Sequence, residues 1–260
     1  MRKLLSADFI LLLRSKIFWA TFVVMLAGTI LLNLSFHNTM QLHGYIASDW
    51  TAEGAIFCMM PGIGTINALW LHFVIGSDYD QGTLRNKVTA GHTRGAIFLS
   101  HWLTACTGAL MNLAVSLVVG TVLSTHFFQD FALDTKGLCW LYLCCALLTL
   151  SYAAICIALA MNLGSKAISI VTGMFVIMGL SIVSSLIDSK VTDITIRGVF
   201  VDPLIEKLIF FFHDFLPSGQ CVQINNLLFD RMGIWPLYSL ALTAIVTAIG
   251  YLLFRRKDMR

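Results

Sequence analysis

Six long apolar stretches without a single Asp, Glu, Lys or Arg constrain this 260-residue chain more than any other feature. A bilayer core about 30 Å thick is crossed by a helix of about 20 predominantly apolar residues, and each stretch is close to that length or longer. Their approximate bounds are 17–34, 55–76, 96–123, 137–163, 167–187 and 234–254. We therefore predict an all-α integral membrane protein with six transmembrane helices in a single domain, residues 1–260.

The composition excludes other classes of protein. Hydrophobic residues make up 58% of the chain and charged residues 12%, against roughly 45–50% and about 25% in an ordinary soluble domain. Intrinsic disorder needs low hydrophobicity, and an odd count of 7 Cys does not suit a disulfide scaffold. Buried cysteines usually act as small apolar side chains. One disulfide on the outer side stays open among Cys58, Cys139 and Cys221.

The basic residues predict the orientation of the chain. With six spans both termini share a side, and the 17 Lys and Arg residues divide 12 to 5 in favour of that side. The 14 Asp and Glu residues divide 4 to 10 in the opposite sense. Cytoplasmic loops retain positive charge. We therefore expect a multi-pass protein with both termini in the cytoplasm.

Two polar or short segments lie on the expected cytoplasmic side. Residues 1–16 are apolar, flanked by basic residues and too short to cross, which predicts an amphipathic interfacial helix with Phe9, Leu12 and Leu13 in the membrane. An extension of the first span is the alternative. In the loop 78–95, Asp80 is placed to cap a short helix that Gly91 ends. Its apolar side chains four residues apart suit a helix that packs against a partner, whereas a solvated loop is the simpler interpretation.

The connection 188–233 is the long external loop. Within it, residues 203–217 are largely apolar, begin and end with proline, and are shorter than a span. This pattern predicts an outer re-entrant or interfacial helix, with a seventh span as the competitor.

No motif for catalysis, metal binding or nucleotide binding occurs in the chain. The phosphate-binding GxxxxGK[ST] loop, HExxH and GxSxG are all absent. The polar residues inside the spans are expected to join helices or to line a path through the membrane. The candidates for such a translocation path are Thr65, Asn67, His72, Thr172, Ser181 and Ser184. A histidine that only faces another helix is the commoner interpretation of His72.

The order of these features resembles the permease subunit of ABC-2 type ABC transporters, and the likeness covers the whole chain. It is carried by the N-terminal helix at 2–16 and by the string GTLRNKV at 82–88, followed by GHTR at 91–94 and IFLS at 97–100. It is also carried by LPSGQ at 216–220 and by FRRKD at 254–258, after the last span.

This resemblance implies a non-catalytic subunit of an ATP-driven exporter in a cell membrane of bacterial type. Its partners would be two separate ABC ATPase subunits, a second permease subunit (identical or paralogous) and membrane lipids, with no nucleic acid. ATP and Mg²⁺ would be held by the ATPase, so this chain itself would carry no cofactor and no metal. The cargo would be an amphipathic or hydrophobic peptide, drug or lipid-like molecule.

The resemblance also assigns expected roles to residues. The cytoplasmic coupling helix that docks on the ATPase would comprise Asp80, Gly82, Thr83, Leu84, Arg85, Asn86, Lys87, Val88 and Gly91. Leu84 and Val88 would enter a cleft of the ATPase, while Arg85 and Lys87 would meet its acidic rim. The second and fifth spans would line the path. The outer gate would include Phe211, Phe212, Phe215 and Pro217.

Two other functions stay open. An intramembrane or lipid-modifying enzyme is disfavoured by the shortage of acidic, Ser/His or metal-binding groups within the spans. A secondary transporter or channel is disfavoured by spans without charge, because ion-driven transporters normally carry an ionisable group there.

Overall fold

The computed structural model describes residues 2–43, 51–128, 131 and 133–257. Within these residues the chain is entirely helical, with no strand. The helices are α1 Arg2–Arg14, α2 Lys16–His43, α3 Ala52–Ile56, α4 Met60–Asp80, α5 Thr83–Thr89, α6 Arg94–Phe127, α7 Thr135–Asn162, α8 Lys166–Thr195, α9 Pro203–Phe215, α10 Pro217–Asn225 and α11 Trp235–Arg256.

Six helical segments are long and apolar enough to cross a membrane, which confirms the number of expected spans. They are Lys16–Thr39, Ala52–Asp80, Arg94–Phe127, Thr135–Asn162, Lys166–Thr195 and Trp235–Arg256. The second segment consists of α3 and α4 with a turn between them, just before Pro61, because proline starts a helix more readily than it continues one. The chain is therefore a multi-pass membrane protein by its length and composition.

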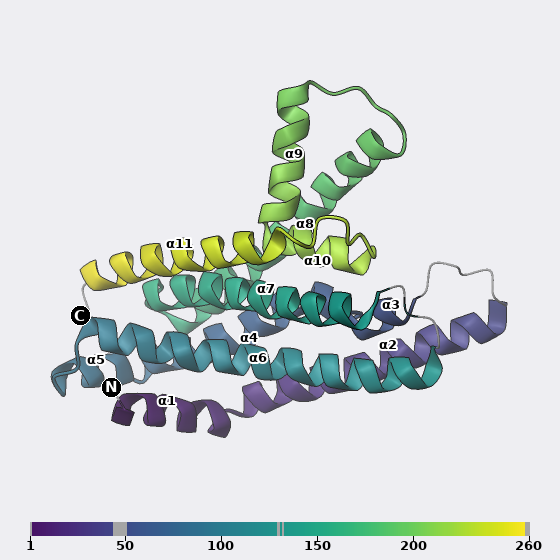
Figure 1. The fold of residues 1–260 in the computed structure, drawn as a ribbon. Coiled ribbons are helices and arrows are strands. Elements are labelled where there is room, and N and C mark those ends of the chain that lie inside the picture. The colour runs from purple at the N-terminus through teal and green to yellow at the C-terminus, as the bar shows by residue number, and fades with distance from the viewer. Residues whose placement is uncertain (1, 44–50, 129–130, 132, 258–260) are drawn as a thin grey trace.

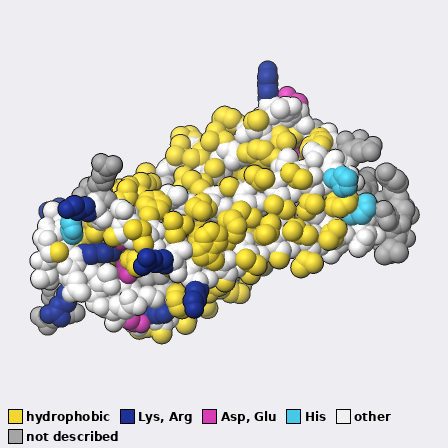
Figure 2. Space-filling model, turned by 90° about the horizontal axis from the view of Figure 1, so that it is seen from below, with side chains coloured by type: hydrophobic (Ala, Val, Ile, Leu, Met, Phe, Trp, Pro, Cys, Tyr) yellow, Lys and Arg dark blue, Asp and Glu magenta, His cyan; other side chains and the backbone are white. Residues whose placement is uncertain are grey.

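The bundle has two different ends. Helix α1 begins and α11 ends at the same end (Figure 1), which we call the termini end; the opposite one is the distal end. Figure 2 shows hydrophobic side chains over the middle of the molecule and most of the visible Lys and Arg side chains at the termini end. This arrangement matches a belt of lipid-facing surface with a basic rim on one side.

Helices α4 and α7 pack inside the bundle, whereas α8 and α11 expose more of their surface. Close approach depends on a few glycines. A Cβ on Gly173 of α8 would overlap the His72 ring of α4, and a Cβ on Gly108 of α6 would lie 2.6 Å from the Trp70 ring. Small residues at such crossings let helix backbones come together in a membrane.

The short helices differ in part from expectation. Helix α1 is separate from α2, since the helix breaks at Ser15, but Leu12 is buried within the protein rather than in lipid, while Leu13 is 48% exposed. The segment 203–217 forms α9 and then bends at Leu216 into α10, which is largely buried against α4, α7 and α8. Cys58, Cys139 and Cys221 are all free thiols.

The packing of Gly173 on His72 leads to a stability prediction. We expect Gly173→Ala to lower the free energy of unfolding by about 1–3 kcal/mol, because the added methyl group overpacks the α4–α8 contact. Gly179→Ala is the matched control in the same helix, since a Cβ there meets nothing within 4 Å. Thermal unfolding of both variants in detergent measures the difference, and equal midpoints would contradict the close contact.

Candidate functional site

The polar site at the termini end is built by the connection between α4 and α6. Helix α4 ends at Asp80, Gly82 turns the chain with a positive φ of 66°, and α5 follows. A second positive φ of 86° at Gly91 turns the chain again into α6, which is capped by the Thr93 hydroxyl. Glycine adopts these backbone angles without strain. The two turns fold α5 back under the ends of α4 and α6.

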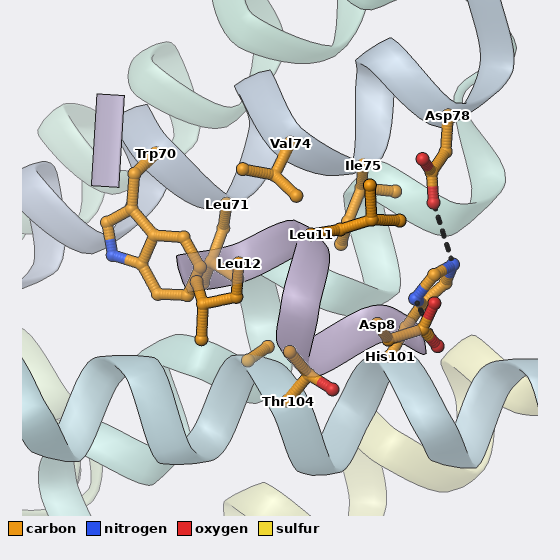
Figure 3. Close-up of a pocket in the computed structure, with 11 residues that line it drawn as sticks. Asp8, Leu11, Leu12, Trp70, Leu71, Val74, Ile75, Asp78, His101 and Thr104 are labelled. Atoms are coloured by element: carbon orange, nitrogen blue, oxygen red, sulfur yellow. Dashed lines mark ion pairs between the residues drawn. The ribbon is translucent and has the colours of Figure 1, made fainter. Parts of the chain in front are cut away.

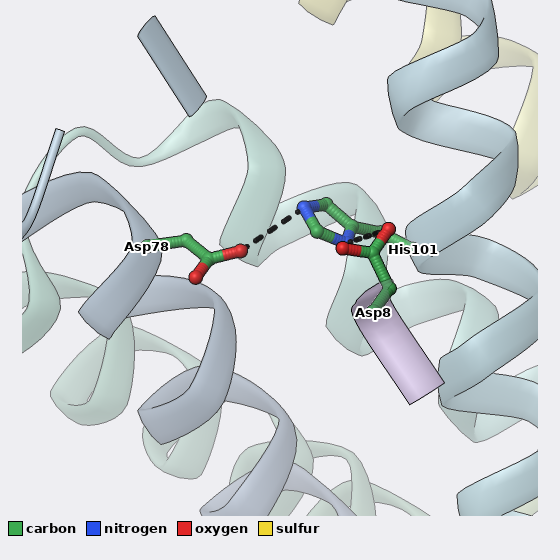
Figure 4. Close-up of side chains that lie close together, drawn as sticks. All are labelled: Asp8, Asp78 and His101. Atoms are coloured by element: carbon green, nitrogen blue, oxygen red, sulfur yellow. Dashed lines mark ion pairs between the residues drawn. The ribbon is translucent and has the colours of Figure 1, made fainter. Parts of the chain in front are cut away.

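This folding brings four ionisable side chains together, which we call the charge cluster: Asp8 of α1, Asp78 of α4, Lys87 of α5 and His101 of α6. All four are nearly buried, with exposed fractions between 3% and 9%. The Lys87 ammonium lies 2.6 Å from Asp8 Oδ1 and 3.4 Å from Asp78 Oδ2. Figure 4 shows the His101 ring between the two carboxylates. The cluster thus joins the three consecutive helices α4, α5 and α6 to α1, which is far from them in the sequence.

The carboxylates of the charge cluster are well provided with partners. His101 Nδ1 lies 3.3 Å from Asp8, and its Nε2 lies 3.3 Å from Asp78. The Ser100 hydroxyl also donates to Asp8, at 2.5 Å. Burial alone would raise the pKa of the Asp8 carboxyl, but hydrogen bonds and attraction from His101, Lys87 and Ser100 hold that pKa well below its usual value. Asp8 is therefore ionised at neutral pH.

The donor set of Asp8, Asp78 and His101 has the spacing of a metal site, with ligand atoms within 4.8 Å of one another. The Lys87 ammonium, however, already contacts both carboxylates. A lysine side chain therefore supplies the positive charge that a divalent ion would otherwise bring, and the cluster is a closed ionic contact within the chain.

A cavity of about 20 Å³ adjoins the charge cluster (Figure 3). Asp78, Asp8 and His101 lie at one end of it and Trp70 at the other, with Leu71 and Leu12 between. This volume is room for about one water molecule, which needs roughly 10–15 Å³. The cavity is too small to hold an organic substrate, so the cluster acts through its contacts with the helices.

A second set of contacts ties α11 to the same end. Arg94, at the start of α6, donates to the backbone carbonyls of Arg255 at 2.8 Å and of Lys257 at 2.5 Å. The Lys257 ammonium donates to the Tyr79 hydroxyl at 2.9 Å, and that hydroxyl donates to the Met161 carbonyl of α7. The α4–α5–α6 connection is therefore bonded to the ends of α7 and α11 as well as to α1.

The structure corrects two expectations about the coupling helix: where it begins and which way its apolar side chains point. Asp80 does not cap it but ends α4, and Gly82 precedes α5. Leu84 and Val88 share a face, as expected, but Leu84 is 2% exposed and both pack in the chain's own core. Lys87 also points inward. Thr83 is half-buried, and the exposed residues from 80 to 93 are Asp80, Gln81, Arg85, Asn86, Thr89, Ala90, Gly91 and Thr93.

The expected path residues fall into two groups. Asn67, His72 and Ser184 are fully buried in contacts between helices: Asn67 Oδ1 accepts from Trp70 and from Asn112, His72 Nδ1 lies 2.8 Å from the Ser169 hydroxyl, and Ser184 bonds Ser218. Thr65, Thr172 and Ser181 are partly exposed on α4 and α8. The interpretation of His72 as a histidine facing another helix agrees with its contact to α8.

The expected gate residues lie on α9 and at the start of α10. Phe211 and Phe212 are 42% and 46% exposed, and Pro217 is buried. The Phe211 and Phe215 rings stack 5.3 Å apart, and both contact Tyr238 of α11.

The charge cluster was not found by sequence reasoning. Its one signal was Asp8, an acid in the middle of an apolar N-terminal helix, because a charge there needs a buried partner or open water. The partners come from three other helices, and no sequence pattern connects them.

Comparison with known sequences adds no identification: no protein-family model matches the chain, and no curated protein matches it either. The fold and the site define a multi-pass helical membrane protein with an internally braced connection between its second and third spans.

The charge cluster predicts a large loss of stability when one partner is removed. We expect Lys87→Met to cost about 3–5 kcal/mol, because two buried carboxylates lose their counter-charge. Lys87→Arg keeps the charge and should therefore lose less stability than Lys87→Met. Adding Asp8→Asn to Lys87→Met should recover part of the loss, as a double-mutant cycle shows for coupled residues. Thermal unfolding in detergent is the measurement.

Lys16→Met is the control, since Lys16 is exposed at the start of α2. Equal stability of the Lys16 and Lys87 variants would contradict the cluster.

Because the pKa of Asp8 is lowered in the folded protein, the contribution of Asp8 to the free energy of unfolding is complete above the ordinary carboxyl pKa of about 4 and disappears as the pH falls below that value. The Asp8 contribution should therefore be constant between pH 6 and pH 8.

Proposed function

We propose that this chain is the membrane subunit of an ATP-driven exporter of the ABC-2 type, with both termini in the cytoplasm. It lies in the cell membrane, pairs with a second permease subunit and is driven by separate ATPase subunits. The cargo is an amphipathic or hydrophobic molecule such as a peptide, drug or lipid.

The observation that carries this proposal is the bracing of α5. Lys87 fixes α5 to α1 and α4 through buried ion pairs. Force applied to α5 therefore reaches three helices at once: α1 and α4 through the ion pairs, and α6 through the contact of Lys87 with His101. Rigid elements of this kind are what a motor needs in order to switch packed spans between two arrangements.

The face that α5 leaves free suits a protein partner. Arg85, Asn86 and Thr89 are exposed at the basic termini end. Charged residues at the rim of an interface steer association and set its register. We assign the contact with the ATPase to this polar face, with Leu84 and Lys87 serving as the inner support of the helix.

The route of the cargo follows from burial. Asn67, His72 and Ser184 are enclosed by their own chain, whereas Thr65, Thr172 and Ser181 reach the surface of α4 and α8. Helix α8 also exposes large apolar side chains, including Phe175 at 79%. We place the path between two subunits, along these faces, where mixed polar and apolar side chains suit an amphipathic cargo.

The proposal predicts the effect of reversing one exposed charge. Arg85→Glu should lower co-purification with the ATPase subunit encoded by the neighbouring reading frame, and vanadate-sensitive ATP hydrolysis, by about tenfold, since a charged interface contact contributes about 1.5–3 kcal/mol. Its thermal midpoint should equal that of the wild type, because Arg85 is exposed. The control is Arg197→Glu, an equal charge reversal on an exposed residue beyond α8.

Unchanged ATP hydrolysis in Arg85→Glu would overturn the docking assignment. If the full chain binds no ATPase subunit at all, the transporter proposal fails as a whole, and an intramembrane enzyme or a secondary transporter takes its place.

A further inference from the structure

A cleft of about 360 Å³ opens between α9 and the start of α11. Helix α9 stands away from the bundle, crosswise to α11, near the end of α11 where that helix begins (Figure 1). The cleft is lined by charged residues of both signs and by aromatic rings: Glu206, Lys207, Phe210, Asp214, Arg231 and Tyr238. Nothing in the proposed transport mechanism uses this cleft.

Two of the four charges already form a pair. Arg231 donates to Asp214 Oδ2 at 3.1 Å, and its guanidinium lies over the Phe210 ring, 4.5 Å from the centroid. The Arg231 side chain remains 47% exposed, so part of its donor set is free. Glu206 and Lys207 form no ion pair within the described part of the chain. The cleft thus offers a free carboxylate and two cationic groups.

An apolar stripe leads out of the cleft along α11. It begins at Ile234, which is 45% exposed, and at Tyr238, which packs on Phe211. On the helix, Ile245 and Ile249 fall on the same face, and both are about half exposed. The stripe from Ile234 to Ile249 is about 22 Å long at 1.5 Å per residue, which is longer than the roughly 15 Å of hydrocarbon in one leaflet and so leaves room for a whole acyl chain.

We propose that this cleft binds the head group of a phospholipid that carries both a phosphate and an amine, from the leaflet at the distal end. The phosphate contacts Lys207 and Arg231, the amine contacts Glu206, and an acyl chain follows the stripe on α11. The first half of α9 supports this geometry, since its apolar side chains Leu204, Ile205 and Leu208 are exposed on the flank away from the cleft. That flank enters lipid while the charged flank faces the cleft.

A head group that carries a phosphate but no amine would leave Glu206 without an ionic partner. An anionic lipid without an amine pairs with Lys207 but places its negative charge beside Glu206. A free phosphate ion uses the basic residues alone and leaves the stripe empty. The arrangement of charges therefore selects a zwitterionic lipid over both alternatives.

Native mass spectrometry of the full chain in detergent tests the proposal. The chain is mixed with equal amounts of phosphatidylethanolamine and phosphatidylglycerol with the same acyl chains, and bound lipid is counted. The wild type should retain mainly phosphatidylethanolamine. Glu206→Lys should reverse the preference, and Lys207→Gln should lower retention of both lipids by about tenfold, the effect of one charge-assisted hydrogen bond. Lys190→Gln, an exposed lysine at the end of α8, is the control and should bind as the wild type does.

Lys207→Gln and Glu206→Lys replace residues that form no ion pair with any described residue, so both variants are expected to fold, whereas a change at Arg231 would remove the ion-pair partner of the buried Asp214. Three outcomes would overturn the proposal: equal retention of the two lipids by the wild type, an unchanged preference in Glu206→Lys, or displacement of the lipid by inorganic phosphate at millimolar concentration. The readout does not involve ATP, so it stands or falls independently of the transport function.

Discussion

The buried contact between Lys87 and two aspartates is the interaction on which the termini end of the molecule depends. Removing a carboxylate or an ammonium from water costs several kcal/mol, and the cost is offset only when the opposite charges meet with good geometry. Asp8, Asp78 and Lys87 meet only if α1, α4 and α5 all take their observed positions. Moving one of these helices would therefore separate buried opposite charges and cost free energy, so the three helices behave as one unit.

The same end holds the backbone of α11 and α7. Arg94 follows the glycine turn after α5 and donates to the last carbonyls of α11, and Tyr79, next to Asp78, bonds the end of α7. In the middle of the bundle, by contrast, helix contacts depend on small residues such as Gly173 and Gly108. Polar bonds therefore fix the relative positions of the helix ends, while close packing fixes their crossings.

The spans and part of the short helices could be predicted because those signals are local. A run of apolar residues predicts a span by its length, and Gly91 follows the end of α5 as expected, whereas the start expected at Asp80 lies instead after Gly82. The direction in which α5 faces is not local. The apolar side chains of Leu84 and Val88 on α5 could pack against any apolar surface, whether in a partner or in the chain itself. In the structure they pack in the chain's own core. Sequence periodicity therefore identifies the apolar face of α5 but does not determine which surface that face packs against.

The pairing of Asp8 with Lys87 lies beyond sequence reasoning for the same reason. A charge count assigns both residues to one side of the membrane, but their contact spans 79 positions and needs the turn at Gly82. The division of Lys and Arg between the two sides did predict the basic character of the termini end, since that division depends only on the number of spans. Global sums of charge are thus readable from a sequence, whereas individual ion pairs follow from tertiary structure.

The two ends of the molecule differ in a way that fits their proposed roles. At the termini end the charge cluster is buried, paired and next to a cavity of only about 20 Å³, so the helices that it joins form a stiff base. Beside α9 and the start of α11, the cleft of about 360 Å³ keeps two charges, Glu206 and Lys207, that form no ion pair in the described chain, and α9 exposes Phe211 and Phe212. Buried ion pairs resist rearrangement, while exposed aromatic and charged side chains exchange contacts at low cost. In the proposed transporter, a motor acting on the stiff base would therefore produce its largest rearrangement near the first half of α9, which exposes Leu204, Ile205 and Leu208, whereas His213 and Asp214 bind its second half to the bundle.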